Sequence, residues 1–305
     1  MVERDVLNAL NQNALRKLEF MNAVSVEDAV GIAWRNLSED YYCHYTTLPN
    51  LLAAIYTGKW FLRRSTSVKL NDLVESAKFG DSNVAKRTYQ LSFGKGVRES
   101  AALWGLYGKD NPYALKVLIP RKDIVAWVDE LSKSYPYVEF KDVIYASIPL
   151  KRPKSVGVEK GRGLNLFWND VACSFAKYPE AKKTLSKKLS EDVYTGWFKD
   201  IEWCHEHETR LCVRVEKKGP DGIVVPYPKG MLHGFSYTFS PWSDKKCRTD
   251  VRNAIRNAIM SVVGQNIRTD KFKRSNVEGA LNFMDEKPVK CAPVRCRLGQ
   301  LLKAD

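Results

Sequence analysis

The order of strand-like and helix-like segments restricts the fold of this chain more than any other feature. Aromatic and β-branched runs predict strands, and apolar residues at intervals of three and four predict helices. Strands are predicted at 41–45, 60–62, 89–93, 113–119, 143–148, 209–216, 222–225 and 236–239. Helices are predicted in two pieces within 2–37, then at 48–57, 72–79, 100–107, 122–134, 180–189, 244–263 and 276–284. Because the two kinds of segment never alternate strictly, we expect an α+β fold with a mixed, largely antiparallel central sheet, flanking helices and an N-terminal helical extension.

Charge and segment type together suggest three parts. We expect an N-terminal helical extension at 1–38, a core α+β domain at 39–230, and a basic C-terminal α/β segment at 231–305 that packs on the core. Residues 245–305 hold 14 Lys and Arg against 6 Asp and Glu, so +8 of the net charge of +14 lies there. Such a surplus fits a polyanionic partner or an anionic substrate, and it also fits a basic protein that binds nothing.

The composition excludes several classes of protein. Hydrophobic residues make up 44% of the chain and charged residues 28%, as in ordinary globular proteins. No run approaches the roughly 20 apolar residues that span a bilayer, and the N-terminus lacks a signal-peptide pattern. We therefore expect a cytoplasmic protein without a membrane partner. The seven cysteines form no CxxC pair, so we expect neither a disulfide framework nor a cysteine-rich zinc site.

The segment WCHEHETR (203–210) is the densest cluster of chemically versatile side chains. Cys204, His205 and His207 include metal-ligand types, but no second cluster with finger-like spacing occurs elsewhere. We therefore expect no metal here.

The same segment carries two carboxylates, Glu206 and Glu208. If both lie at the start of a strand, their spacing of two puts them on one face. Two carboxylates on one face raise each other's pKa and suit acid–base work or the stabilisation of an oxocarbenium ion. On spacing alone, a pair that faces solvent or binds Arg210 or a nearby lysine is the simpler interpretation.

Aromatic residues and a histidine mark two other places. His44, one of only four histidines, lies in the strand-like run YYCHYTT and is either a buried polar residue or a ligand contact. Trp104 and Tyr107 are three apart on a predicted helix and share a face. Such a pair fits a packed core and also fits a platform for a ligand.

Polar residues in two further segments have structural explanations as well. Asn71 and Asp72 fit a helix N-cap, and Glu75 completes a capping box. Ser92, within the apolar segment LSF, is a hydroxyl that needs a hydrogen-bond partner when buried.

These pieces occur in one order over residues 41–230: HYTT, LNDLVES, SF, WGLY and EHETR. This order resembles bacterial domain-of-unknown-function family 2971, which has a similar HYT opening, an LNDxxE element, an S-F strand, a WxxY turn and an ExExR element. The resemblance implies that Asn71, Asp72 and Glu75 line one pocket together with residues of the other motifs.

A histidine on the first core strand, a serine on a later strand and a late ExE strand also resemble the ADP-ribosyltransferase superfamily, which implies the same kind of fold. The resemblance implies that His44 holds the adenosine ribose of NAD and that Ser92 supports the nicotinamide end. It implies that Glu208 engages the nicotinamide ribose as the glycosidic bond loosens, and that Glu206 activates the target. The other residues expected at the NAD site are Tyr45, Thr46, Trp104, Tyr107 and Arg210.

The leading hypothesis is therefore an ADP-ribosyltransferase-like enzyme that cleaves the nicotinamide bond of NAD and modifies nucleic acid or protein, in bacterial toxicity or phage defence. Arg248, Arg252 and Arg256 form a basic row on the predicted helix at 244–263, suited to a polyanionic target or to packing at the rim of the core.

Two alternatives remain open. One is a nuclease-like defence module in which Asp72, Glu75, Glu206 and Glu208 gather a divalent metal. The other is a non-catalytic interaction protein whose polar motifs are structural.

Overall fold

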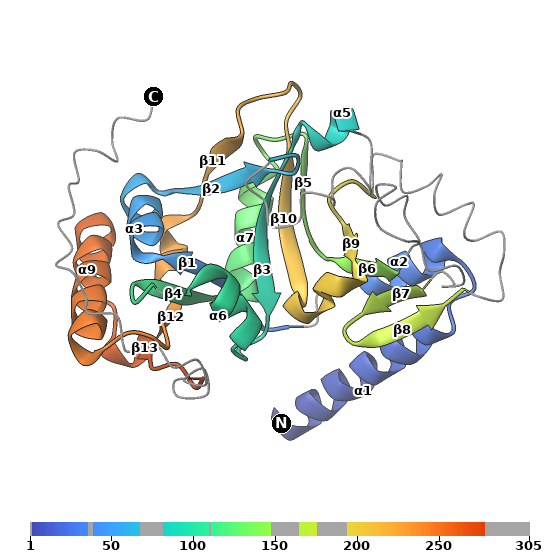
Figure 1. Ribbon diagram of the computed structural model, residues 1–305, viewed down its shortest axis with the longest axis horizontal. Coiled ribbons are helices and arrows are strands. Elements are labelled where there is room, and N and C mark those ends of the chain that lie inside the picture. Colours follow the sequence, from blue (N-terminus) through green and yellow to red (C-terminus); the bar gives the residue numbers. More distant parts are fainter. Residues whose placement is uncertain are drawn as a thin grey trace, which may run out of the picture. The chain divides into compact units, whose positions relative to one another are not determined.

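The computed structural model describes residues 2–35, 39–67, 82–109, 111–147, 165–175 and 194–277 (Figure 1). The helices expected at 72–79 and 180–189 lie outside these residues, as does nearly all of the one expected at 276–284. The chain divides into two compact units, each assembled from three segments. Unit 1 comprises Met1–Glu39, Leu62–Gly94 and Ser132–Ile223, and unit 2 comprises Asp40–Phe61, Lys95–Leu131 and Val224–Asp305. The three-part division expected from the sequence stays a prediction.

The main sheet of unit 1 is antiparallel, with β10 (Glu208–Arg214) between two partners. β10 pairs with β3 (Thr88–Lys95) on one side and with β5 (Tyr137–Asp142) on the other, and β3 also pairs with β2 (Lys59–Arg64). All of β10 except Arg214 is buried, so neither face of this strand is exposed to solvent, and its polar residues are buried together with its apolar ones.

A second, smaller sheet completes unit 1, in the order β8-β7-β6-β9. Its strands are β6 (Ile144–Ser147), β7 (Asn165–Trp168), β8 (Val171–Ser174) and β9 (Phe198–Asp200). The N-terminal helices α1 (Val2–Met21) and α2 (Val26–Trp34) pack with this sheet, and Figure 1 shows α1 running beside β8. The short helix α5 (Ser82–Ala85) and the 3-10 helix η2 (Ile201–Glu206) also belong to unit 1.

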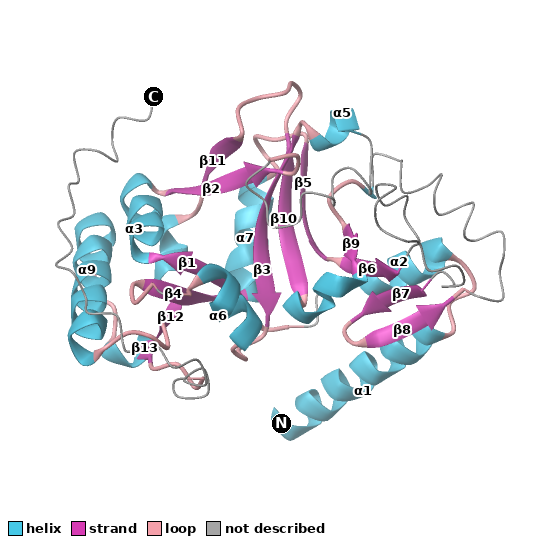
Figure 2. Ribbon diagram, in the orientation of Figure 1, coloured by secondary structure: helices cyan, strands magenta, loops and turns pink. Residues whose placement is uncertain are grey.

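Unit 2 is built on four strands in the order β1-β4-β12-β13 (Figure 2). They are β1 (Tyr41–Thr47), β4 (Ala114–Pro120), β12 (Ser236–Phe239) and β13 (Phe272–Lys273). The helices are α3 (Leu48–Thr57), α6 (Ala101–Tyr107), α7 (Arg121–Leu131) and α9 (Lys245–Val263), with the 3-10 turns η3 (Lys229–His233) and η4 (Thr269–Lys271). Both β2 and β11 (Gly222–Pro226) cross the division between the units.

Local signals explain where the helices begin and end. The Ser25 hydroxyl accepts from the backbone N–H of Asp28 and caps α2, and the Asp244 carboxylate accepts from the N–H of Cys247 and caps α9. Gly58 ends α3 at φ 63°, a left-handed conformation that favours glycine.

The α+β class, the largely antiparallel pairing and the N-terminal helices are confirmed. Parallel pairing occurs between β6 and β9 and between β12 and β13. The predicted strands omit β5, because all of its residues but the last are half-buried and the strand shows no alternation of buried and exposed positions. They also omit β7 and β8, because four residues are too few for a clear alternating pattern. Among the described helices, none is long and apolar enough to cross a membrane.

Candidate active site

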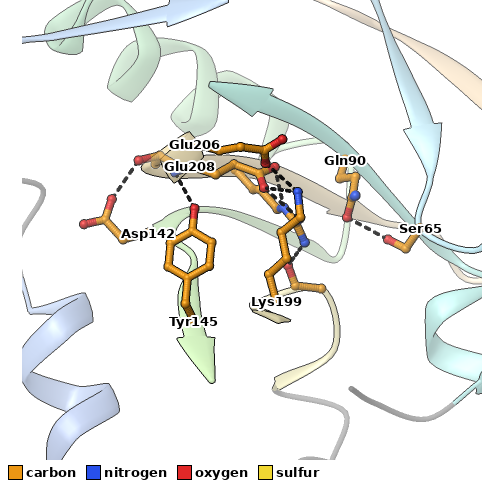
Figure 3. A network of polar contacts seen from close by, with 10 residues as sticks. Ser65, Gln90, Asp142, Tyr145, Lys199, Glu206 and Glu208 are labelled. Carbon is orange, nitrogen blue, oxygen red and sulfur yellow. Dashed lines mark hydrogen bonds and ion pairs between the residues drawn. The ribbon is translucent and has the colours of Figure 1, made fainter. Parts of the chain in front are cut away.

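Four charged side chains meet inside unit 1, two from β10, one from β9 and one from η2 (Figure 3). Lys199 Nζ lies 2.5 Å from Oε2 of Glu206 and 3.3 Å from Oε2 of Glu208. Arg210 donates to both oxygens of Glu208, from Nε at 2.7 Å and from Nη2 at 2.9 Å. All four residues are at most 5% exposed. The ammonium of Lys199 therefore bridges the two carboxylates, and the guanidinium of Arg210 binds the carboxylate of Glu208 in a bidentate manner.

The two glutamates meet for a reason other than the one expected. β10 begins at Glu208, whereas Glu206 is the last residue of η2, so the premise that both lie on the strand is wrong. Between them His207 has φ 44° and ψ 49°, the left-handed conformation. This reversal brings the side chains of Glu206 and Glu208 to one ammonium.

Neighbouring residues of unit 1 fix the position of β10. The N–H of Glu208 donates to the Tyr145 hydroxyl at 2.8 Å, and the N–H of Val143 donates to the carbonyl of Glu208 at 2.9 Å. Thr209 donates its hydroxyl to Asp142 at 2.7 Å (Figure 3). The carbonyl of Gly196 accepts from Nη1 of Arg210 at 2.7 Å. These bonds hold the carboxylate of Glu208 in one orientation.

The two carboxylates differ in protonation. Burial opposes ionisation of Glu208, but Arg210 and Lys199 outweigh it and hold the pKa of that carboxyl well below its usual range. Burial, followed by the charge of Glu208, raises the pKa of Glu206 to about 7. Oε1 of Glu206 is buried and accepts no hydrogen bond from any described residue. The site thus pairs a permanent anion with a carboxyl that gains and loses a proton near neutrality.

Ser92 joins this network from β3, where it lies opposite Arg210 in the strand register. A hydrogen bond between its hydroxyl and Glu208 also favours the ionised carboxylate. Of the residues expected at the site, the structure therefore brings together Glu206, Glu208, Arg210 and Ser92. Asn71, Asp72 and Glu75 lie outside the described residues.

The remaining expected NAD-binding residues belong to unit 2. His44 is half-buried on β1, with its ring 5.6 Å from that of Trp60. Tyr45 points to the opposite face of the strand, where its hydroxyl accepts from the N–H of Ser100 at 3.0 Å. Its ring meets Trp104 edge-on at 4.9 Å.

The other three expected NAD-binding residues of unit 2 differ in their exposure. Trp104 is fully buried, and its indole N–H donates to Glu99 at 2.9 Å, so it packs as a core residue. Thr46 is 9% exposed on β1, and Tyr107 is 40% exposed at the end of α6. Because His44 and Glu208 belong to different units, the expectation that both contact NAD stays a prediction.

The helix expected to carry the arginine row is present as α9. Arg248, Arg252 and Arg256 are all half-buried. Arg252 lies over the rings of Phe239 and Phe272 at 5.8 and 5.9 Å, so its guanidinium covers the rim of the unit 2 core.

A hollow of about 850 Å³ opens on unit 2. Its charged lining combines Arg121, Lys122 and Lys271 with Asp40 and Asp123. No residue expected at the site lines it.

Sequence reasoning missed Lys199 and Tyr145. Lys199 follows the aromatic pair WF at 197–198. A lysine within a buried aromatic segment needs an anionic partner, and this was the signal in the sequence that could have revealed it. Its Nζ also lies 4.6 Å from the ring of Trp203. Within the described parts of the chain, no group of three or more His, Cys, Asp or Glu is placed to hold a metal.

No protein-family model and no curated protein matches the sequence. Among solved structures, the chain is similar to DarT of Thermus sp. 2.9 in complex with NAD+, with 10% identity over 76% of this chain and 97% of that chain and a TM-score of 0.33. It is also similar to the same DarT in complex with ADP-ribosylated ssDNA, with 10% identity, 77% and 97% coverage and a TM-score of 0.32. Values this low do not place the chain in a family, and membership of domain-of-unknown-function family 2971 stays a prediction.

Proposed function

We propose that this protein is an ADP-ribosyltransferase-like enzyme that cleaves the nicotinamide–ribose bond of NAD and transfers ADP-ribose to nucleic acid or protein. One observation carries the proposal: two buried carboxylates share an ammonium, yet their surroundings push their pKa values apart. Paired titratable groups separated in this way are typical of acid–base sites.

The chemistry assigns a role to each carboxylate. Loss of nicotinamide gives the ribose oxocarbenium character, and a fixed anion such as Glu208 stabilises that charge in the transition state. Glu206 is ionised in part at neutral pH, so it can receive the proton of an attacking hydroxyl. Ser92 supports Glu208, as its hydrogen bond indicates.

Unit 2 carries further residues that the resemblance assigns to NAD, and their part in NAD binding is proposed from that resemblance alone. His44 and Thr46 share one face of β1 and are proposed to contact the adenosine end. Tyr107 is the exposed aromatic residue proposed to stack on a base or on nicotinamide. A polyanionic target is proposed to bind along Arg248 and Arg256, and a role in toxicity or phage defence is part of the same proposal.

The decisive experiment measures NAD consumption and labelling of RNA, DNA and protein mixtures with NAD that carries a labelled adenylate. We expect Glu208→Gln to lower NAD consumption by about 10²-fold or more, as removal of a transition-state charge partner does. Glu139→Gln is the matched control, because Glu139 is a half-buried carboxylate of unit 1 bound to Lys141 at 2.7 Å.

Wild-type NAD consumption in Glu208→Gln contradicts the proposal. Magnesium-dependent cleavage of nucleic acid that is lost in Asp72→Asn favours the nuclease hypothesis instead. Binding without turnover, unaffected by all of these changes, favours the non-catalytic hypothesis.

A further inference from the structure

One oxygen of the carboxylate pair differs from the other three. Both oxygens of Glu208 are bound by Arg210, and one of them also contacts Lys199. Oε2 of Glu206 is bound by Lys199, whereas Oε1 of Glu206 is buried and has no hydrogen-bond partner among the described residues. A buried acceptor without a partner is costly, and in a native protein it calls for an explanation.

Lys199 explains why Oε1 is the oxygen without a hydrogen-bond partner in the described part of the chain. Its ammonium reaches Glu206 and Glu208 at once, and it comes from β9, a different element from either glutamate. It therefore fixes Glu206 by Oε2 and turns Oε1 away from the ion pairs. We propose that Lys199 is a positioning residue, which orients Glu206 so that Oε1 accepts a hydrogen bond, and then a proton, from a hydroxyl of the bound acceptor.

This inference rests on the proposed function and names the acceptor group as a hydroxyl. In the transfer step the bond between ribose C1′ and the nicotinamide nitrogen breaks, and its electron pair leaves with neutral nicotinamide. A bond from the acceptor oxygen to C1′ forms, and the hydroxyl proton passes to Oε1 of Glu206. No other reactant is needed.

The charged and titratable groups around Glu206 come from three further elements. Lys199 of β9 and Arg210 of β10 favour its ionised form, whereas Glu208 of β10 opposes it. Tyr145 of β6 contacts the backbone of Glu208. The raised pKa of Glu206 places its proton exchange near neutrality, which suits a proton acceptor.

The first test needs no NAD. The titration of Glu206 is followed by NMR on protein labelled with 13C-glutamate and is identified by its loss in Glu206→Gln. In Lys199→Met we expect it to move upward by about 1–3 pH units, because an opposite charge within hydrogen-bond distance has gone. Lys199→Gln, which is also uncharged, carries the same expectation, and Lys199→Arg restores a titration near that of the wild type.

Lys141→Met is the matched control, because it removes an ammonium bound to a different glutamate of unit 1, Glu139. We expect it to leave the Glu206 titration unchanged. An unchanged titration in folded Lys199→Met or Lys199→Gln overturns the inference. If neither folds, Lys199→Met combined with Glu206→Gln removes both partners, and failure of that protein to fold also overturns it.

The second test measures transfer to an acceptor and hydrolysis of NAD separately. We expect Lys199→Met to lower transfer by at least tenfold more than hydrolysis, and to shift the pH dependence of transfer in step with the Glu206 titration. Equal losses overturn the inference. A wild-type protein that consumes no NAD refutes the proposed function, while the titration still decides whether Lys199 positions Glu206.

Discussion

Replacing Arg210 by Met should show how much the buried ion pair stabilises unit 1. Arg210 is 1% exposed, and its removal takes away two hydrogen bonds to Glu208 and one to the carbonyl of Gly196. Breaking a buried pair from one side costs about 3–5 kcal/mol. With a urea m-value of about 2 kcal/mol/M, a loss of about 4 kcal/mol lowers the unfolding midpoint by about 2 M.

Arg268 provides a matched control, because it also donates from Nε and Nη2 to a carboxylate, at 3.2 Å to Oδ1 and 2.9 Å to Oδ2 of Asp270. These side chains are 81% and 60% exposed, so Arg268→Met should cost at most about 1 kcal/mol. Urea unfolding of both variants, followed by circular dichroism, makes the comparison. An Arg210→Met variant that loses no more stability than Arg268→Met refutes the reasoning.

The pH dependence gives a second check on the same variant. In the wild type the pKa of Glu208 lies below its usual range, so its stabilising contribution is present above pH 4.5 and is lost as the pH falls through the lowered pKa. Without Arg210 one of the two cations that lower that pKa has gone, so the pKa rises, and acid then relieves the less compensated charge by protonation. The difference in stability between the two proteins should therefore be smaller at pH 5 than at pH 8.

Three other perturbations have clear expected outcomes. The pKa of Glu206 is raised to about 7 from an ordinary 4.5, so between these pH values the folded protein holds a proton that the unfolded chain has lost, and stability falls by about 3 kcal/mol as the pH rises through this range. Urea unfolding at pH 5 and pH 8 should show this fall in the wild type and not in Glu206→Gln. An equal change in stability in the two proteins contradicts the reasoning. Gly196→Ala should cost about 1–2 kcal/mol in thermal unfolding because φ is 88° there, and an unchanged midpoint contradicts the strain. Tyr45→Phe should cost about 1–2 kcal/mol by the same assay, because the N–H of Ser100 loses its acceptor, and a neutral effect contradicts that role.

Much of the fold was predictable because its elements carry strong local patterns. The helix between Thr47 and Gly58 and the long α9 have clear ends and apolar faces. The four-residue strands β7 and β8 were not predictable, because a strand this short is defined by its partners and not by its own pattern.

The candidate site was predictable only in part. Glu206 and Glu208 stand out in the sequence, but the bridging role of Lys199 does not, because only the fold turns its ammonium toward both carboxylates. The opposite directions of His44 and Tyr45, by contrast, follow from strand alternation alone. Because neighbours on a strand point to opposite faces of the sheet, these two side chains cannot line the same side of β1.

Asp142 has a consequence for finding relatives of this protein. It is the last residue of β5, it lies two residues before the first strand of the second sheet, and it is 1% exposed. Its carboxylate accepts from Trp168 and Thr209, and its carbonyl accepts from Trp34. Loss of this carboxylate therefore leaves the Trp168 indole and the Thr209 hydroxyl without their acceptor, so positions 142, 168 and 209 should vary together or not at all. When distant homologues are aligned, this joint pattern offers a signature that overall identity does not supply.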